Sequence, residues 1–206
     1  MEKNPVIGIV MATMGEAKPF VEGMSLIRTE RDPFLVFMND NIVIVISGIG
    51  KANAAMGAMY CCDKYKPELV CNLGAAGATD LTSSVGDIYH INEIVEYDRP
   101  EFKSGRAFVH KPMVLDGFRT AKVATQDRAV ISHEKRKEVS QHAGLCDMEA
   151  ASVVQACRKF RIECIVFKFV SDTPDYNESN DIMHYIKKYR GPFFEFFAEE
   201  VLPVIT

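Results

Sequence analysis

Three carboxylates in the sequence could carry out acid–base chemistry, because each lies near the end of a predicted strand or the start of a predicted helix. Asp172 follows residues 164–170, an apolar run interrupted only by Lys168, which predicts a buried strand. Glu149 lies near the start of the preceding predicted helix. Glu16 follows the first predicted strand, where the simpler interpretation is a first-turn glutamate favoured by the helix dipole. Ligands of open α/β sheets bind beyond the carboxyl ends of the strands, so we expect Asp172 at such a site.

Two glycine-containing stretches also follow predicted strands. Residues 74–78 have the sequence GAAGA, and five small residues in a row leave backbone groups accessible to a flat ligand. Residues 48–51 have the sequence GIGK and precede a helix predicted for residues 52–65. This stretch lacks the spacing of a phosphate-binding loop or a dinucleotide fingerprint. It fits either a tight turn that lets the helix pack closely or a close approach of the backbone to a ligand.

The composition argues against several classes of site. The net charge is −4, and the 24 Lys and Arg residues form no long block, so neither nucleic acid nor a membrane surface is an expected partner. The apolar segment near the N-terminus is too short for a signal peptide or a membrane span. The five histidines and six cysteines show no metal-ligand spacing, so we expect no metal and no other cofactor. We interpret the cysteines as reduced core residues of a cytoplasmic protein.

Predicted strands and helices alternate along the chain, which indicates a single α/β domain. We predict three layers, α/β/α, around a central mixed, mostly parallel sheet. The predicted strands are residues 5–11, 34–39, 42–47, 69–73, 121–125 and 164–170, with another in 84–90. The predicted helices begin at about residue 18 and at the cap Asp147, and cover residues 52–65, 132–141 and 192–204. We expect residues 132–141 to face solvent, residues 192–204 to dock through their phenylalanines, and residues 98–120 to form a polar surface segment.

These residues predict a cavity with about three carboxylates, no metal and no basic cluster that could hold a phosphate. Such a cavity fits acid–base chemistry on a neutral, flat, polar small molecule.

The order of several segments resembles the nucleoside phosphorylase/nucleosidase superfamily. The segments are GIVMATMGEAKPF, SGIGKANAAMGA, NLGAAGA, VGDIY, DMEAASV and VSD. Within that superfamily the chain most resembles the 5′-methylthioadenosine/S-adenosylhomocysteine nucleosidases, over residues 1–95 and 121–182. The resemblance implies one nucleoside phosphorylase-like domain over residues 1–206, a homodimer, and a nucleoside as the small-molecule substrate. The implied reaction is hydrolysis of the N-glycosidic bond of a 5′-modified purine nucleoside, with release of the base.

The resemblance also implies a role for each carboxylate. Asp172 resembles the acid that hydrogen-bonds purine N7 and protonates the leaving base. Glu149 resembles the carboxylate that binds the ribose 2′- and 3′-hydroxyls and supports an oxocarbenium-like transition state. Glu16 resembles the residue that orients and deprotonates the attacking water. The implied substrate-binding residues are Ile49 near the 5′ substituent, Ala76, Gly77 and Val130 along the base and sugar, Met148 against the ribose, and Ser171 beside Asp172.

Two alternatives stay open at this point. A phosphate-dependent phosphorylase is one, although the early glycine loops lack the arginines of the phosphorylase branches and so favour water as the nucleophile. A non-catalytic nucleoside-binding protein is the other, because fold does not fix function. Three departures from the family concern the substrate: Ala75 replaces a serine, Ala129 after Arg128 replaces a base-stacking aromatic residue, and residues 98–120 are shortened. They predict weaker adenine recognition and room for a 5′ group larger than methylthio.

Overall fold

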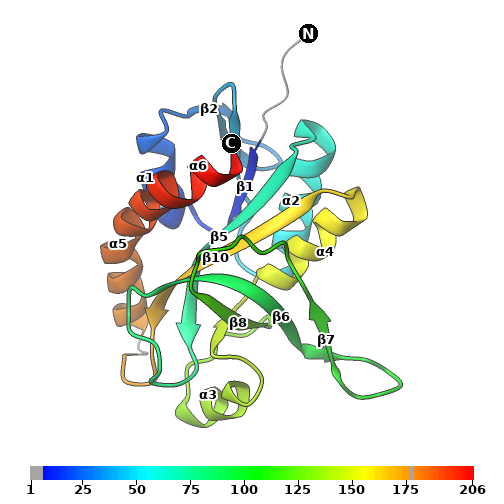
Figure 1. Ribbon diagram of the computed structural model, residues 1–206, viewed down its shortest axis with the longest axis vertical. Coiled ribbons are helices and arrows are strands. Elements are labelled where there is room, and N and C mark those ends of the chain that lie inside the picture. The colour runs from blue at the N-terminus through cyan, green and yellow to red at the C-terminus, as the bar shows by residue number, and fades with distance from the viewer. Residues whose placement is uncertain (1–6, 177–178) are drawn as a thin grey trace.

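The structure is a computed structural model that describes residues 7–176 and 179–206. A mixed sheet forms the middle layer, and helices cover both of its faces (Figure 1). This arrangement confirms the predicted three-layer α/β/α fold. Residues 5 and 6 of the first predicted strand lie outside the described residues. No helix in the described ranges is long and apolar enough to cross a membrane.

The sheet contains ten strands, with four parallel neighbours at its centre. The strands are β1 (Ile7–Met11), β2 (Ile27–Glu30), β3 (Leu35–Met38), β4 (Ile42–Ile46), β5 (Leu69–Ala78), β6 (Ile88–Pro100), β7 (Ala107–His110), β8 (Thr120–Thr125), β9 (Leu145–Asp147) and β10 (Glu163–Asp172). The parallel neighbours follow the order β10–β5–β1–β4. Their carboxyl ends therefore meet at one edge of the sheet, as expected from the alternation of elements.

One half of the sheet curls back on itself. Strand β5 pairs with β10, β10 with β6, β6 with β8, β8 with β9, and β9 again with β5. The segments that follow β8 and β9 are thereby brought next to the ends of β5 and β10.

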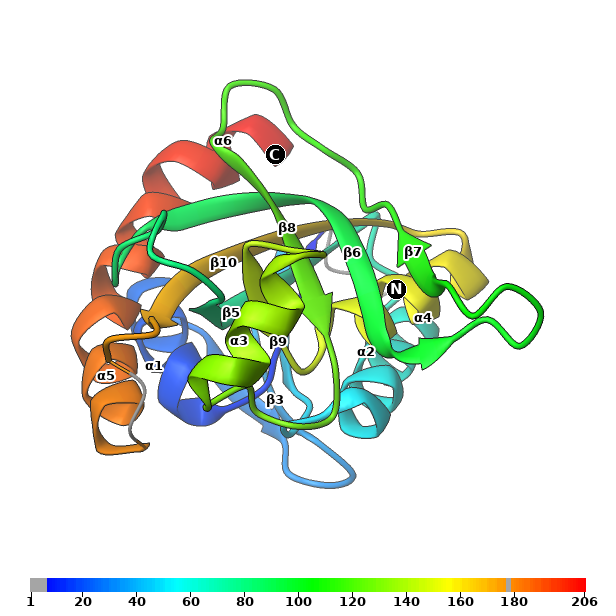
Figure 2. The ribbon, with the colours of Figure 1, turned by 90° about the horizontal axis from the view of Figure 1, so that it is seen from below.

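Helices pack on the two faces of the sheet around two apolar cores. The helices are α1 (Met14–Gly23), α2 (Lys51–Tyr65), α3 (His133–Ser140), α4 (Ala150–Phe160), α5 (Ser179–Phe196) and α6 (Leu202–Ile205), with a π-helical turn at Phe197–Val201. Helices α1 and α5 meet on one face, where the ring of Phe20 contacts Phe193 and Phe197 with centroids 5.8 and 5.6 Å apart. Helices α2 and α4 cover the other face, and α3 lies across the end of the sheet (Figure 2). All six cysteines are free and buried, as predicted.

Several boundaries differ from the sequence-based expectations. Helix α1 begins at Met14, four residues earlier than predicted, because the Thr13 hydroxyl accepts a hydrogen bond from the Glu16 N–H and closes a capping box. Strand β5 continues through the GAAGA run to Ala78, because that run pairs with β10. Residues 98–120 are only partly a surface segment, since they include the end of β6, all of β7 and side chains packed on the core.

Candidate active site

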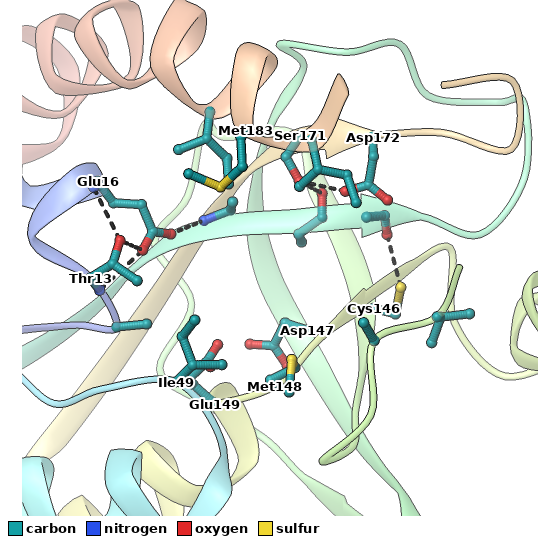
Figure 3. Close-up of a pocket in the computed structure, with 18 of the residues that line it drawn as sticks. Thr13, Glu16, Ile49, Cys146, Asp147, Met148, Glu149, Ser171, Asp172 and Met183 are labelled. Atoms are coloured by element: carbon teal, nitrogen blue, oxygen red, sulfur yellow. Dashed lines mark hydrogen bonds between the residues drawn. The ribbon is translucent and has the colours of Figure 1, made fainter. Parts of the chain in front are cut away.

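A cavity of about 450 Å³ opens at the carboxyl ends of β1, β5 and β10. All nine predicted site residues line it. They are Glu16, Ile49, Ala76, Gly77, Val130, Met148, Glu149, Ser171 and Asp172. Figure 3 shows Glu16 on one side, Glu149 below and Asp172 on the far side of the same space. The structure thus brings together carboxylates that lie up to 156 positions apart in the sequence (172 − 16 = 156).

Glu16 lies in the first turn of α1 and also lines the cavity. Its Oε2 accepts hydrogen bonds from the Thr13 hydroxyl at 2.6 Å and from the Thr13 N–H at 3.2 Å. Its Oε1 accepts one from the Ala75 N–H at 2.9 Å, so the carboxylate is fixed between α1 and β5. A Cβ at Gly74 would lie 2.9 Å from Oε1, which explains a glycine at that position. Glu16 is therefore the first-turn glutamate of the simpler interpretation and a cavity residue as well.

Glu149 occupies the N-cap position of α4 and is held by the glycine stretch that precedes α2. The Gly50 N–H donates a hydrogen bond to Glu149 Oε1 at 2.9 Å. Gly48 and Gly50 have φ values of +89° and +99°, which side-chain-bearing residues rarely adopt. The backbone of the GIGK stretch thus approaches a buried carboxylate. Of the two interpretations of this stretch, close packing of the helix is confirmed, since a Cβ at Gly57 of α2 would lie 2.6 Å from Ser47 Cβ. Approach of the backbone to a ligand stays a prediction.

The protonation of Glu149 depends on its surroundings. Burial is the largest influence on Glu149 and raises its pKa to about 7. The nearby carboxylates Asp147 and Glu16 add to this rise, whereas Lys168 and the Gly50 N–H oppose it. The ordinary value is 4.5, so the folded protein binds this proton more tightly than the unfolded chain does. The resulting stabilisation is complete below pH 4.5 and is lost as the pH rises through about 7.

We therefore expect Glu149→Gln, which stays neutral, to stabilise the protein at about pH 8. The gain in unfolding free energy should be up to about 3 kcal/mol, because one unit of pKa corresponds to about 1.4 kcal/mol. Near pH 4.5 the variant and the wild type should unfold alike. Denaturant unfolding at both pH values measures this, with the exposed Glu22→Gln as the control. A variant less stable than the wild type at about pH 8 would contradict this account of Glu149.

Asp172 ends β10 and receives hydrogen bonds from two protein groups. The Ser171 hydroxyl donates to Asp172 Oδ1 at 2.6 Å, and the Arg136 guanidinium forms an ion pair with Oδ2. Arg136 belongs to α3, the helix predicted to face solvent, yet it is only 1 % exposed. That prediction was wrong for this side chain, because the face of α3 that carries Val139 packs against the end of the sheet. Val139 three residues later was the signal in the sequence that position 136 faces inward.

A second buried ion pair lies beneath the cavity, between Lys168 and Asp147. The Lys168 Nζ and Asp147 Oδ2 are 2.8 Å apart. Burial opposes the charged form of Lys168, but Asp147 and Glu149 outweigh it and raise the pKa of the lysine. The sequence predicts Asp147 as the cap of the next helix, but Asp147 ends strand β9 and helix α4 begins at Ala150. The Asp147 side chain still accepts a hydrogen bond from the Ala150 N–H, at 2.9 Å from its Oδ2. A lysine inside an apolar strand requires a buried anionic partner, and this was the signal that sequence reasoning left unused.

Most of the acidic and basic side chains that line the cavity are carboxylates. Glu16, Asp147, Glu149 and Asp172 line it, and among the described lining residues Arg128 alone carries a cationic side chain. Within the described ranges, no group of three or more His, Cys, Asp and Glu side chains could hold a metal ion. Such a cavity can stabilise positive charge that develops on a bound neutral molecule, and its carboxylates can exchange protons with that molecule or with water.

Known proteins share both sequence and fold with this chain. The curated 5′-methylthioadenosine/S-adenosylhomocysteine nucleosidase of Staphylococcus epidermidis is 29 % identical over 155 residues, which cover 64 % of this chain and 68 % of that protein. The nucleosidase of the same name from Helicobacter pylori has the same fold, with a TM-score of 0.81 at 19 % identity over 95 % of this chain and 97 % of the other. The futalosine hydrolase of Helicobacter pylori superposes with a TM-score of 0.80 at 20 % identity, over 93 % and 95 % of the two chains.

A sequence profile of a whole family matches as well. The profile of the phosphorylase superfamily covers residues 6–116, which is more than half of the 206 residues. The chain belongs to the phosphorylase superfamily.

Proposed function

We propose that the protein is a nucleosidase that hydrolyses the N-glycosidic bond of a 5′-modified purine nucleoside and releases the base. The observation that carries the proposal is the convergence of Glu16, Glu149 and Asp172 on one cavity at the carboxyl ends of the strands. The names of the relatives support the reaction class, since one nucleosidase matches this chain in sequence, and another nucleosidase and a hydrolase share its fold.

Each of the three carboxylates acts on a different reactant group: the base, the sugar or the attacking water. Asp172, in its protonated form, donates a hydrogen bond to N7 of the base and transfers its proton to N7 as the glycosidic bond breaks, which makes the base a better leaving group. Glu149 binds the ribose hydroxyls and stabilises the cationic sugar of an oxocarbenium-like transition state. Glu16, fixed by Thr13 and Ala75, orients and deprotonates the attacking water.

The charge of the cavity favours water over phosphate as the nucleophile. Four carboxylates and one guanidinium line the cavity. Lys168 and Arg136 offset the charges of Asp147 and Asp172, so the repulsion of a phosphate dianion comes from Glu16 and from Glu149 when it is ionised. Neutral water meets no such barrier.

The 5′ end of the substrate is expected to lie between Ile49 and helix α5. Ile182, Met183 and Ile186 of that helix line the cavity with apolar side chains. Ala129 offers no aromatic face for the base, so we propose that a large 5′ group provides binding free energy that base stacking does not.

Base release from a panel of nucleosides tests the proposed function. We expect the purified protein to release purine in phosphate-free buffer, with kcat/KM higher for 5′ groups larger than methylthio. Chromatography of the free base over time measures this for methylthioadenosine, S-adenosylhomocysteine and longer 5′-thioethers. Methylthioadenosine exceeding all larger substrates by about tenfold would contradict the 5′ assignment. Tight binding of nucleosides with no base release would identify a binding protein instead.

We further propose a homodimer in the cytoplasm. Met56 and Met59 on α2 and Ile49 just before it are each about half exposed, and we propose that these apolar side chains contact a second copy of the chain. The six free cysteines suit a reducing compartment. Light scattering should give twice the chain mass of 23.1 kDa, and Met59→Glu should shift that mass toward the monomer. A monomeric wild type at micromolar concentration would exclude this interface.

A further inference from the structure

We propose that Lys51 is a positioning residue, which fixes the stretch of backbone that hydrogen-bonds Glu149. The inference deepens the proposed function and rests on it for the role of Glu149 in turnover, although the hydrogen bond itself can be tested without a substrate. Its basis is a group of charged residues that we call the Lys51 network, which comprises Lys51, Glu96, Asp98 and Asp127. None of these four is among the described residues that line the cavity.

Lys51 is the first residue of α2, where a lysine is unfavourable. The N-terminal end of a helix carries partial positive charge, so it favours carboxylates and disfavours cations. Gly50, which precedes the helix, has no side chain that could cap it. The Asp127 carboxylate caps the helix instead, since its Oδ1 accepts a hydrogen bond from the Lys51 N–H at 2.7 Å. The stability of α2 therefore explains Asp127, whereas the cation at position 51 requires another explanation.

The side chain of Lys51 closes a ring of hydrogen bonds. Its Nζ donates to Asp98 Oδ1 at 2.6 Å and to Glu96 Oε1 at 3.2 Å, both on β6. Asp98 Oδ2 accepts a hydrogen bond from the Asp127 N–H at 2.9 Å, and the Asp127 carboxylate in turn accepts the one from the Lys51 N–H. The ring thus joins the start of α2 to β6 and to the segment that follows β8, and it fixes both the backbone and the side chain of Lys51.

The ring depends on its cation. The side chains of Lys51 and Glu96 are 16 % and 4 % exposed. Burial opposes the charged form of Lys51, but Asp98 and Glu96 outweigh it and raise the pKa of the lysine. Arg99 also pairs with Glu96, whereas within the described ranges Lys51 is the one cation paired with Asp98. Removal of the ammonium group therefore leaves Asp98 without its counter-ion and opens the ring.

The ring acts on the cavity through Gly50, the residue next to Lys51. The Gly50 N–H donates to Glu149 Oε1 at 2.9 Å, and Gly50 has a φ of +99°. Glycine adopts many backbone conformations, so its own sterics do not fix the direction of this N–H. The chain before it is fixed where the Gly48 N–H donates to the Ala12 carbonyl oxygen at 3.0 Å, and the ring fixes the chain after it. Loss of the ring therefore lets this donor move away from Glu149.

The amide proton of Gly50 reports this hydrogen bond in the absence of substrate. A charge-assisted hydrogen bond to a carboxylate is short and strong, and it shifts the NMR signal of the donor proton downfield. The measurement is made at about pH 8, above the pKa of about 7 to which burial raises Glu149. We expect Lys51→Met, which keeps an unbranched side chain, to move this signal upfield by at least half as much as Glu149→Gln does.

The matched control is Lys64→Met. Lys64 lies in the last turn of the same helix and pairs with Glu30, so this variant also removes an ion-paired lysine from α2. We expect it to leave both the Gly50 amide proton and the turnover unchanged, because Glu30 belongs to the edge strand β2 and lies outside the Lys51 network.

Turnover tests whether the ring positions Glu149 for the reaction. We expect Lys51→Met to lower kcat/KM by about 10- to 10²-fold, since a small misplacement of a catalytic group has an effect of that size. In the Glu149→Gln background the same substitution should lower kcat/KM by less than about threefold, because the charge that Lys51 positions is already absent. A general loss of structure would instead lower kcat/KM by the same factor in both backgrounds.

Circular dichroism melts establish that each variant is folded, and Asp98→Asn replaces Lys51→Met if the latter does not fold. An unchanged Gly50 amide proton in Lys51→Met would overturn the inference, and so would a kcat/KM within about twofold of the wild type. Equal losses in the wild-type and Glu149→Gln backgrounds would overturn it as well. If the amide proton moves as expected but the wild type cleaves no nucleoside, the proposed function fails while the action of Lys51 on Glu149 stands.

Discussion

Asp172→Asn is expected to slow base release by about 10²- to 10⁴-fold, the usual contribution of a positioned acid–base group. The affinity for the nucleoside should stay within about tenfold, because the amide can still hydrogen-bond the base. An amide neither supplies a proton nor stabilises a protonated N7, so the loss should fall on turnover. Steady-state kinetics and inhibitor binding with the same nucleoside measure the two effects separately.

The control for this variant is Asp175→Asn, which changes an exposed carboxylate three residues further on. Because Asp172→Asn leaves Arg136 without its counter-ion, we also expect it to lower the free energy of unfolding by about 3 kcal/mol or more. Kinetics are therefore measured well below the melting temperature. Retention of more than about a tenth of the wild-type turnover would remove Asp172 from the catalytic role.

Glu149→Gln is expected to lower kcat/KM by about 10²- to 10³-fold, although it should stabilise the fold at about pH 8. The substitution removes the negative charge that faces the cationic sugar and weakens the charge-assisted hydrogen bond to the ribose hydroxyls. Because burial raises the pKa of Glu149 to about 7, wild-type activity should also rise with pH through about that value.

The preference for ribosides over 2′-deoxyribosides separates this role from a general loss of structure. If Glu149 binds the 2′-hydroxyl, the variant should lose most of the wild-type preference, whereas Glu22→Gln should keep it. A variant that discriminates between ribosides and 2′-deoxyribosides as strongly as the wild type would show that Glu149 does not contact that hydroxyl.

Elements with strong local patterns were predictable from the sequence. The hairpin at residues 34–47 and the helix at 52–65 appear within a residue or two of their expected positions, because apolar runs, a polar turn and a terminating proline specify them locally. Strand β2 was missed, since its four residues are mostly polar and exposed at the sheet edge. Strand β9 was missed because three residues show no period, and its place depends on pairing with β5 and β8.

The C-terminal helix begins earlier than the sequence predicts. The sequence predicts a helix over residues 192–204 from the helical spacing of its phenylalanines. In the structure Pro192 lies inside α5, which begins at Ser179, while Phe193 and Phe197 still pack on Phe20 as expected. The polar residues before the proline hid the first turns of the helix.

The cavity was predictable through its carboxylates but not through the cations that hold them. Glu16, Glu149 and Asp172 stand at strand ends or helix starts, which local patterns reveal. Arg136 and Lys168 act through partners 36 and 21 positions away (172 − 136 = 36; 168 − 147 = 21), and only the tertiary fold brings these charges together.

The sugar product formed in the presence of inorganic phosphate tests the central claim most directly. With a 5′-modified adenosine as substrate, mass spectrometry should find free 5-modified ribose in an amount equal to the released base, at a rate that phosphate does not change. A sugar 1-phosphate that forms only when phosphate is present would contradict hydrolysis and assign the protein to the phosphorylases.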